Sequence, residues 1–239
     1  MENSIYIGLS RQTVLQRNMD IIANNVANMN TTGFRGQNLV FEEYLSDPRF
    51  GDDPLSFVVD NRQYQNTDYG AFKQTENPFN VALNGPGFIA VQMPNGGTGY
   101  TRDGDFSMRP DGTLVNASND PILGLGGPIT IPANATEISI DERGMVSTQD
   151  GTIGQIQVAE FANVQDLEPR GNNLYVTNQP VQQPDNTIVR QGFLEGSNVK
   201  PVLEMTRMIE VLRDFQSTQR LLESEHERMR GAIQKLTEA

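Results

Sequence analysis

Few residues in this sequence are spaced as a chemical site would require. Asp103-Gly104-Asp105 begins like a calcium-binding loop, but the later glycine and the bidentate glutamate of such a loop are not at the required spacing. Gly85-Pro86-Gly87 lacks both the Lys-Ser/Thr ending of a phosphate-binding loop and a helix after it. We interpret the first motif as a hairpin turn and the second as a tight turn into a buried strand.

Catalytic and metal-binding residue types are equally sparse. The single histidine, His226, falls on an apolar helical face without convergent partners, and the chain has no cysteine, which excludes thiol catalysis and thiolate metal sites. Loop carboxylates could pair as in a hydrolase, but the sequence distinguishes no particular pair. We therefore expect no enzyme activity, cofactor or metal, and keep a β-domain hydrolase or carbohydrate-binding protein as the alternative.

The charge distribution narrows the classes of partner. The formal net charge is −12, and the Lys and Arg residues form no run. Binding to nucleic acid needs clustered basic residues, so we expect neither nucleic acid nor a small-molecule substrate. Residues 1–4 lack the basic start and apolar core of a cleaved secretory signal, and the longest apolar run is only residues 88–91. We expect no cleaved export signal and no membrane span.

The N-terminal segment has the periodicity of a helix. Residues on one face recur at steps of three and four, which is a heptad pattern: Ile5, Gly8, Gln12, Leu15, Met19, Ile22, Val26 and Met29. Ser4 is the expected N-cap, and Gly33 is expected to supply the left-handed residue after the last turn. A helix of about 26 residues would be roughly 40 Å long.

The C-terminal segment repeats the pattern, again with steps of three and four: Met205, Met208, Leu212, Phe215, Gln219, Leu222, His226, Met229, Ile233 and Leu236. Pro201 suits the first turn of this helix. Two paired helices bury one seam and leave outer apolar residues exposed, for which we expect Leu9, Val14, Val211 and Leu221. Such residual apolar surface favours association with other subunits.

Between the helices the pattern becomes that of strands and turns, so the predicted class is α+β with a central all-β domain over residues 70–192. Residues 1–35 and 193–239 are predicted to form a discontinuous coiled-coil domain from the two terminal helices. Residues 36–69 fit neither pattern, and we interpret them as an extended connector. Its separated aromatic residues are expected to serve as anchors, with these candidates: Phe41, Tyr44, Phe50 and Phe57.

Three segments carry a family resemblance. Residues 21–35 read IIANNVANMNTTGFR, which resembles the N-terminal signature of the flagellar basal-body rod and hook proteins. Residues 194–199 (LEGSNV) with 204–209 (EMTRMI) resemble the family's C-terminal motif, and residues 84–88 (NGPGF) with 100–106 (YTRDGDF) resemble its middle. The residues that carry the two terminal motifs are Asn24, Asn25, Asn28, Gly33, Phe34, Glu195, Ser197 and Asn198.

The resemblance implies a structural subunit of the rod in the flagellar basal body, polymerised through its terminal helices into a torque-transmitting shaft across the periplasm. Length and the opening residues are most similar to the proximal-rod branch, and a distal-rod or hook-type protein stays open. The implied partners are proximal and distal rod subunits, copies of the chain itself and, transiently, the flagellar type III export apparatus. We expect the three asparagines to make contacts across helices between subunits.

Overall fold

The computed structural model describes residues 2–46 and 55–237, and side chains over residues 5–41 and 63–236. The chain divides into two compact units. The helical unit comprises Met1–Ala27, Gln37–Asn66 and Lys200–Ala239, and the β unit comprises Asn28–Gly36 and Thr67–Val199. Two terminal helices flanking a β-rich centre confirm the predicted α+β class.

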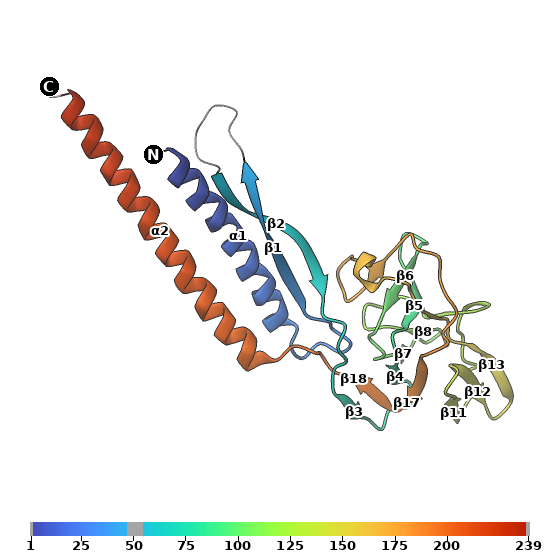
Figure 1. Cartoon of the computed structure of the whole chain (residues 1–239). Helices are drawn as coiled ribbons and strands as arrows, with labels where there is room; N and C mark the ends of the chain where they lie inside the picture. Colours follow the sequence, from blue (N-terminus) through green and yellow to red (C-terminus); the bar gives the residue numbers. More distant parts are fainter. Residues whose placement is uncertain (1, 47–54, 238–239) are drawn as a thin grey trace. The chain divides into compact units, whose positions relative to one another are not determined.

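Two antiparallel helices form the main part of the helical unit (Figure 1). α1 (Glu2–Ala27) contains no proline, and α2 (Pro201–Thr237) begins at the expected proline. Ser4 lies inside α1 and therefore does not cap it. α1 ends where Asn, Thr and Gly begin to dominate the sequence, since these residues propagate a helix poorly. Met29 consequently lies beyond the helix.

The buried seam between the helices is short. Its core consists of Leu15, Ile22 and Val211, and four half-buried side chains pack against this core: Met19, Val26, Met208 and Phe215. Val14, expected at an exposed flank, is buried on a second face of α1, and Val211, also expected at a flank, is buried at the seam between the helices. Only Leu9 and Leu221 of the four expected flank residues are exposed.

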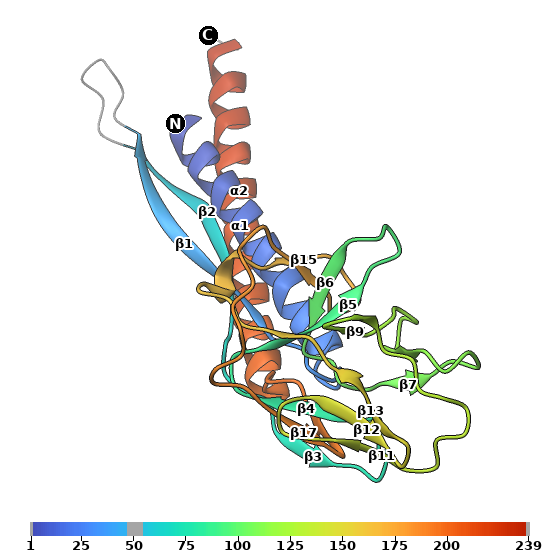
Figure 2. The same cartoon turned by 90° about the vertical axis from the view of Figure 1, so that its right-hand side faces the viewer.

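The segment interpreted as a connector is instead a β-hairpin of the helical unit. β1 (Gln37–Ser46) pairs antiparallel with β2 (Leu55–Gln65), with a register shift between Val40 and Phe41. Figure 2 shows this hairpin beside α1, against which both strands pack. A two-stranded hairpin is marginal alone. Its packing on α1 explains both its stability and the burial of a second α1 face.

The β unit is built from short antiparallel strands. A five-stranded sheet has the order β14-β5-β6-β16-β15, and β11, β12 and β13 form a meander. The strands are β3 (Phe72–Gln74), β4 (Val81–Asn84), β5 (Phe88–Gln92), β6 (Thr98–Thr101), β7 (Ser107–Met108), β8 (Leu114–Val115), β9 (Leu123–Gly124), β10 (Gly127–Pro128), β11 (Ile138–Ile140), β12 (Met145–Thr148), β13 (Gly151–Gln155), β14 (Val158–Ala159), β15 (Glu168–Pro169), β16 (Tyr175–Val176), β17 (Ile188–Gln191) and β18 (Phe193–Glu195), with a 3-10 helix at Val164–Asp166.

Pairing of the first and last strands sets where the chain enters and leaves this unit. β3 pairs with β18, and β4 pairs with β17. The predicted bounds differ from those observed: the unit continues past residue 192 to Val199, and it includes residues 28–35, predicted to belong to the N-terminal helix, and residues 36 and 67–69, predicted to belong to the connector. A large aliphatic core and a smaller aromatic core around Phe88 fill it. Within the part of the chain described, no helix is long and apolar enough to cross a bilayer.

Candidate functional site

In the helical unit, Asn25 joins three elements. Its Nδ2 donates to the Gln37 carbonyl at 2.8 Å, and its Oδ1 accepts from the Gln37 N–H at 2.9 Å. Nδ2 also donates to Oε2 of Glu204 at 3.2 Å. The amide therefore fixes the last turn of α1, the start of β1 and the first turn of α2. Asn25 is buried by its own subunit, which differs from the intersubunit contact expected for it.

Glu204, the buried carboxylate in this network, is held from a second side. Nη1 of Arg207 donates to its Oε1 at 2.8 Å and to Oδ1 of Asn38 at 3.4 Å. Buried carboxylates are tolerated when their oxygens accept hydrogen bonds, as both oxygens of Glu204 do. The start of α2 is thus tied to β1 as well as to α1.

In the β unit, the two sequence signatures meet. Gly33 has φ +65° and donates its N–H to the Glu195 carbonyl at 2.7 Å. A Cβ at this position would lie 2.4 Å from the carbonyl carbon of Arg102. Gly33 is therefore required by a close approach of two backbones, and its left-handed conformation occurs six residues after α1 has ended.

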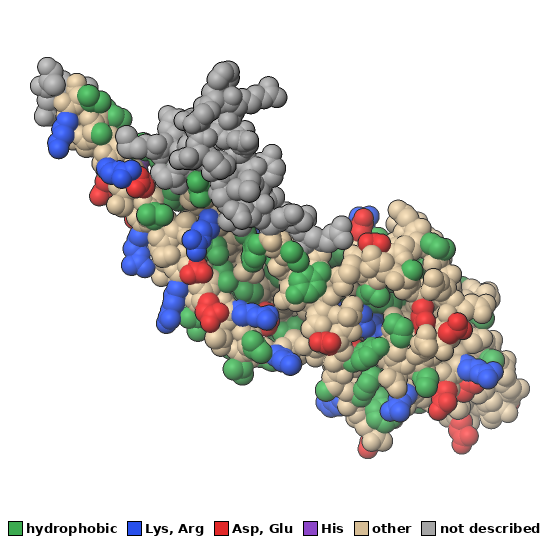
Figure 3. Space-filling view, viewed as in Figure 1, with side chains coloured by type: hydrophobic (Ala, Val, Ile, Leu, Met, Phe, Trp, Pro, Cys, Tyr) green, Lys and Arg blue, Asp and Glu red, His purple; other side chains and the backbone are tan. Residues whose placement is uncertain are grey.

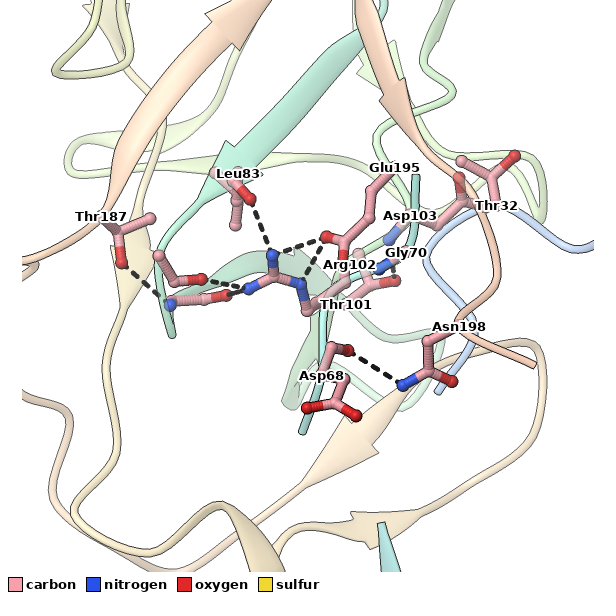
Figure 4. A network of polar contacts seen from close by, with 12 residues as sticks. Thr32, Asp68, Gly70, Leu83, Thr101, Arg102, Asp103, Thr187, Glu195 and Asn198 are labelled. Carbon is pink, nitrogen blue, oxygen red and sulfur yellow. Dashed lines mark hydrogen bonds and ion pairs between the residues drawn. The ribbon is translucent and has the colours of Figure 1, made fainter. Parts of the chain in front are cut away.

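Asn198 supplies the second link between the signatures. Its backbone N–H donates to the Phe34 carbonyl at 3.2 Å, and its Oδ1 accepts from the Gly36 N–H at 2.7 Å. Its Nδ2 donates to the Asp68 carbonyl at 2.9 Å. The C-terminal motif and the segment after α1 are consequently held together as one local structure (Figure 4).

Arg102 lies at the centre of this structure and is fully buried. Nε and Nη2 donate to Oε2 of Glu195 at 2.8 and 2.5 Å, Nη1 donates to the carbonyls of Gly85 and Gly87 at 2.7 and 2.6 Å, and Nη2 also donates to the Leu83 carbonyl at 2.7 Å. All five guanidinium donors are used (Figure 4). The turn at Gly85 thus presents carbonyl acceptors to a cation, the opposite of a phosphate loop.

A second guanidinium, that of Arg35, is also buried, with 2% of the residue exposed. Its Cζ lies 5.3 Å from the Phe88 ring centre and 6.0 Å from that of Tyr69, and its Nε has no hydrogen-bond partner among the described residues. Burial, reinforced by the neighbouring Arg102 charge, lowers the pKa of Arg35 to about 10. The Glu195 carboxylate, which is hydrogen-bonded to Arg102, opposes this lowering of the Arg35 pKa in part.

The sequence indicated this centre only in part. Glu195 and Asn198 are residues of the C-terminal motif, whereas Arg102 stands within the YTRDGDF segment and is not a predicted site residue. An arginine immediately after the buried strand β6 was the available signal. Of the other signature residues, Asn28 accepts from the Thr31 hydroxyl at 3.1 Å, and the Ser197 hydroxyl accepts from the Val199 N–H at 3.2 Å. The Asn24 side chain is exposed on α1.

The residues considered for metal or acid–base chemistry lie in surroundings typical of residues with a structural role. Asp103-Gly104-Asp105 links β6 to β7, strands that do not pair with each other, so it is not a hairpin turn. Burial raises the pKa of Asp103 to about 6. Among the described residues no group of three His, Cys, Asp or Glu side chains could hold a metal, and His226 is exposed on α2.

The predicted packing residues divide between two faces of α2. Met208, Phe215, Leu222 and Met229 lie on the partly buried face toward α1, in register with the buried residues Glu204, Val211 and Thr218. Met205, Leu212, Ile233 and Leu236 are exposed, and Ile5 on α1 is half-buried. Hydrophobic residues recur at steps of three and four along either face. Of the predicted anchors, Phe41 is exposed, and the side chains of Tyr44, Phe50 and Phe57 lie outside the described residues.

Comparison with known proteins adds three matching families. Residues 5–35 match "Flagella basal body rod protein", residues 82–148 match "Flagellar hook protein FlgE/F/G D1 domain", and residues 190–235 match "Flagellar basal body rod FlgEFG protein C-terminal". The flagellar basal-body rod protein FlgF of Caulobacter vibrioides is 37% identical over 99% of this chain and 98% of its own. FlgF of Mesorhizobium japonicum is 37% identical over 93% and 92%, and FlgG of Buchnera aphidicola is 32% identical over 89% and 92%.

Proposed function

Because the chain belongs to the flagellar basal-body rod protein family and is a structural subunit of the basal-body rod, we propose that an exposed apolar face of α2 polymerises it with neighbouring rod subunits. The resulting shaft would transmit torque, and the proposed role involves no catalysis. Both terminal helices belong to one unit of the chain, so this unit is the natural building block of such a shaft.

One observation carries this proposal. Val202, Met205, Ile209 and Leu212 recur at steps of three and four along α2, and their exposed fractions are 80%, 48%, 52% and 41%. We call these four residues the outer stripe. The residues that face α1 lie on a different side of the helix. Figure 3 shows hydrophobic side chains between the charged ones along the visible face of this unit.

The outer stripe resembles the seam of a coiled coil whose second helix is absent. It extends for roughly 15 Å at 1.5 Å per residue. A contiguous apolar surface of this kind on a soluble subunit usually marks an interface. Among the described residues, three buried hydrophobic residues form the core of the α1–α2 seam, so contacts with neighbours would be a further source of helix stabilisation.

Ile209→Asp tests the proposal. A carboxylate in the centre of an interface remains buried without a partner, so we expect loss of rod completion and of motility. The melting temperature of the purified subunit should not change, because Ile209 is exposed in it. Ser224→Asp adds the same charge at another exposed position of α2 and should leave motility intact. A fully motile Ile209→Asp strain would contradict the proposal.

We also infer that the subunit reaches the rod unfolded, through the flagellar type III export apparatus, and occupies the proximal rod. The proximal position is what the resemblance of the sequence implies. The absence of cysteine means that no disulfide has to be reduced before export. Labelling the subunit in isolated basal bodies tests the position. If the route is correct, the subunit should accumulate in the cytoplasm when the export gate is inactivated. Secretion of the subunit that is unaffected by this inactivation would contradict the route.

A further inference from the structure

The β unit contains two asparagine–glycine pairs, Asn84-Gly85 and Asn95-Gly96. In such a pair the peptide nitrogen of the glycine can attack the side-chain amide of the asparagine, because glycine has no side chain to shield that nitrogen. The attack requires the peptide unit between the two residues to rotate. The surroundings of each pair in the folded chain therefore decide whether it can react.

The pair Asn95-Gly96 lies in the turn between β5 and β6. The Gly96 N–H donates to the Met93 carbonyl at 2.9 Å, and Gly96 has φ +82°. Asn95 and Gly96 are both exposed, and a Cβ on Gly96 would meet no other described atom within 4 Å. Little packing therefore opposes rotation of this peptide unit.

The Asn95 side chain is also held in a conformation that favours attack. Its Oδ1 accepts a hydrogen bond from the Gly97 N–H at 3.0 Å. The ring that this bond closes includes the Gly96 nitrogen, so the side-chain amide lies folded over the peptide unit that would attack it. The Gly97 N–H polarises the amide carbonyl and would stabilise the negative charge that Oδ1 gains during the attack.

The pair Asn84-Gly85 is constrained in the folded chain. Asn84 is the last residue of β4 and pairs with Ile188 of β17. The Gly85 carbonyl accepts from Nη1 of Arg102 at 2.7 Å, and a Cβ on Gly85 would lie 2.3 Å from the Asn186 carbonyl oxygen. Rotation here would disturb the strand pairing and take an acceptor from a buried guanidinium. Asn84 is exposed as well, so exposure alone does not distinguish the two pairs.

We propose that Asn95 is a site of spontaneous deamidation in the folded subunit. The Gly96 nitrogen forms a bond to Cγ of Asn95, the Cγ–Nδ2 bond breaks, and the proton of the Gly96 nitrogen leaves with Nδ2 as ammonia. The product is a succinimide. Water then opens this ring at either carbonyl, which gives aspartate or isoaspartate. Each product carries a carboxylate in place of the neutral amide, and water is the co-reactant.

The two products have different effects on the hairpin of β5 and β6. Aspartate retains an oxygen that can accept from the Gly97 N–H, so it changes mainly the surface charge. Isoaspartate adds the side-chain methylene to the main chain of a turn that closes the pairing of Gln92 with Thr98. This product should weaken the end of the hairpin. Because the reaction proceeds without an enzyme, the modified fraction should rise with the age of the subunit.

Peptide mass spectrometry of the full chain, kept in mildly alkaline buffer, tests the site. Trypsin cleaves after Lys73 and Arg102 and has no cleavage site between them, so one peptide contains both pairs. Fragmentation of this peptide assigns the mass gain of deamidation to Asn84 or Asn95. In the folded chain Asn95 should react at least about tenfold faster, which corresponds to a barrier lower by about 1.4 kcal/mol.

The same measurement in urea separates the effect of the fold from that of the sequence. The two rates should become similar there, because unfolding removes the constraint on Asn84. A rate at Asn84 equal to or above that at Asn95 in the folded chain would overturn the proposal. So would a folded Asn95 that stays unmodified under conditions in which the unfolded chain reacts.

Two glutamine variants provide a matched control with a second readout. The wild type should develop an acidic form on isoelectric focusing. Asn95→Gln should suppress the early acidic form, because the longer side chain closes the ring less readily, and Asn84→Gln should leave it unchanged. Both positions are exposed, so both variants should keep the wild-type melting temperature. An acidic form that appears at the wild-type rate in Asn95→Gln would contradict the assignment.

Discussion

At the scale of residues, the β unit depends on a buried ion pair. Arg102 and Glu195 come from the middle and the C-terminal motif of the sequence, and Gly33 from the N-terminal signature lies against the Arg102 backbone. Burying such a pair costs desolvation energy, so its net contribution is small while both partners are present. Removal of one partner leaves a buried charge without compensation, which is strongly destabilising.

Glu195→Gln should therefore lower the free energy of unfolding by about 3 kcal/mol. Glu168→Gln is the matched control, because Glu168 is paired with Arg170 at 3.7 Å on an exposed surface, where loss of the pair should cost less than about 1 kcal/mol. Urea unfolding of both variants measures the difference. Equal effects would show that the buried pair does not hold the signatures together.

Asp103 should make stability depend on pH. Burial raises the pKa of its carboxyl from 3.8 to about 6, so the folded state binds a proton more tightly than the unfolded state does. The stability that the protonated Asp103 carboxyl contributes is fully present below its unfolded-state pKa of 3.8, and it is lost as pH rises through about 6. Between pH 5 and 7.5 the melting temperature should fall less in Asp103→Asn than in the wild type. Asp185→Asn, at an exposed position of the β unit, should retain the wild-type slope.

At the scale of elements, α1 packs closely against α2 at Gly8. A Cβ on Gly8 would lie 2.6 Å from Cδ2 of Leu222. This contact is near one end of the helix pair, and the Asn25–Glu204 hydrogen bond is near the other. The two contacts together define the antiparallel register of the helices.

Gly8→Val should destabilise the helix pair, and adding Leu222→Ala should recover part of the loss because it removes the side chain that the valine displaces. We expect a coupling energy of about 1 kcal/mol in this double-mutant cycle, measured by thermal unfolding at 222 nm. Gly231→Val is the control, since a Cβ there meets open space. The expected register would be excluded by additive effects of Gly8→Val and Leu222→Ala.

At the scale of the whole molecule, the two units have very different cores. The helical unit buries Leu15, Ile22 and Val211 at its seam, whereas the β unit has a large aliphatic core and an additional aromatic one. Segments with fewer buried apolar contacts open locally at a lower free-energy cost. The helical unit should open first in the free subunit and gain its stability on assembly.

Hydrogen exchange of the full chain measures this difference. Amides of α1 and α2 should exchange at least about tenfold faster than those of β4, β5 and β6, which corresponds to an opening free energy lower by about 1.4 kcal/mol. In assembled rods the helices should become protected. Uniform protection across the free subunit would contradict the expected division.

Local physical chemistry in the sequence was enough to predict both terminal helices. Steps of three and four, the proline at position 201 and the lack of proline within α1 act over a few residues, so no distant contact is needed to recognise them. The turn-rich centre identified the β unit for the same reason. The signature motifs indicated the family through residue types and spacing that stand within short segments of the sequence.

Only the tertiary structure decided which surfaces those elements bury. The hairpin of residues 37–65 was missed because its strands are stabilised by packing on α1 and its alternation is interrupted at Val40. The same steps of three and four fit two faces of α2, and contact with α1 selects the face of Val211. Asn25 and Arg102 are hydrogen-bonded to the carboxylates of Glu204 and Glu195, which lie 179 and 93 residues away in the sequence. Such pairings depend on chain folding over long distances, which periodicity and propensity do not encode.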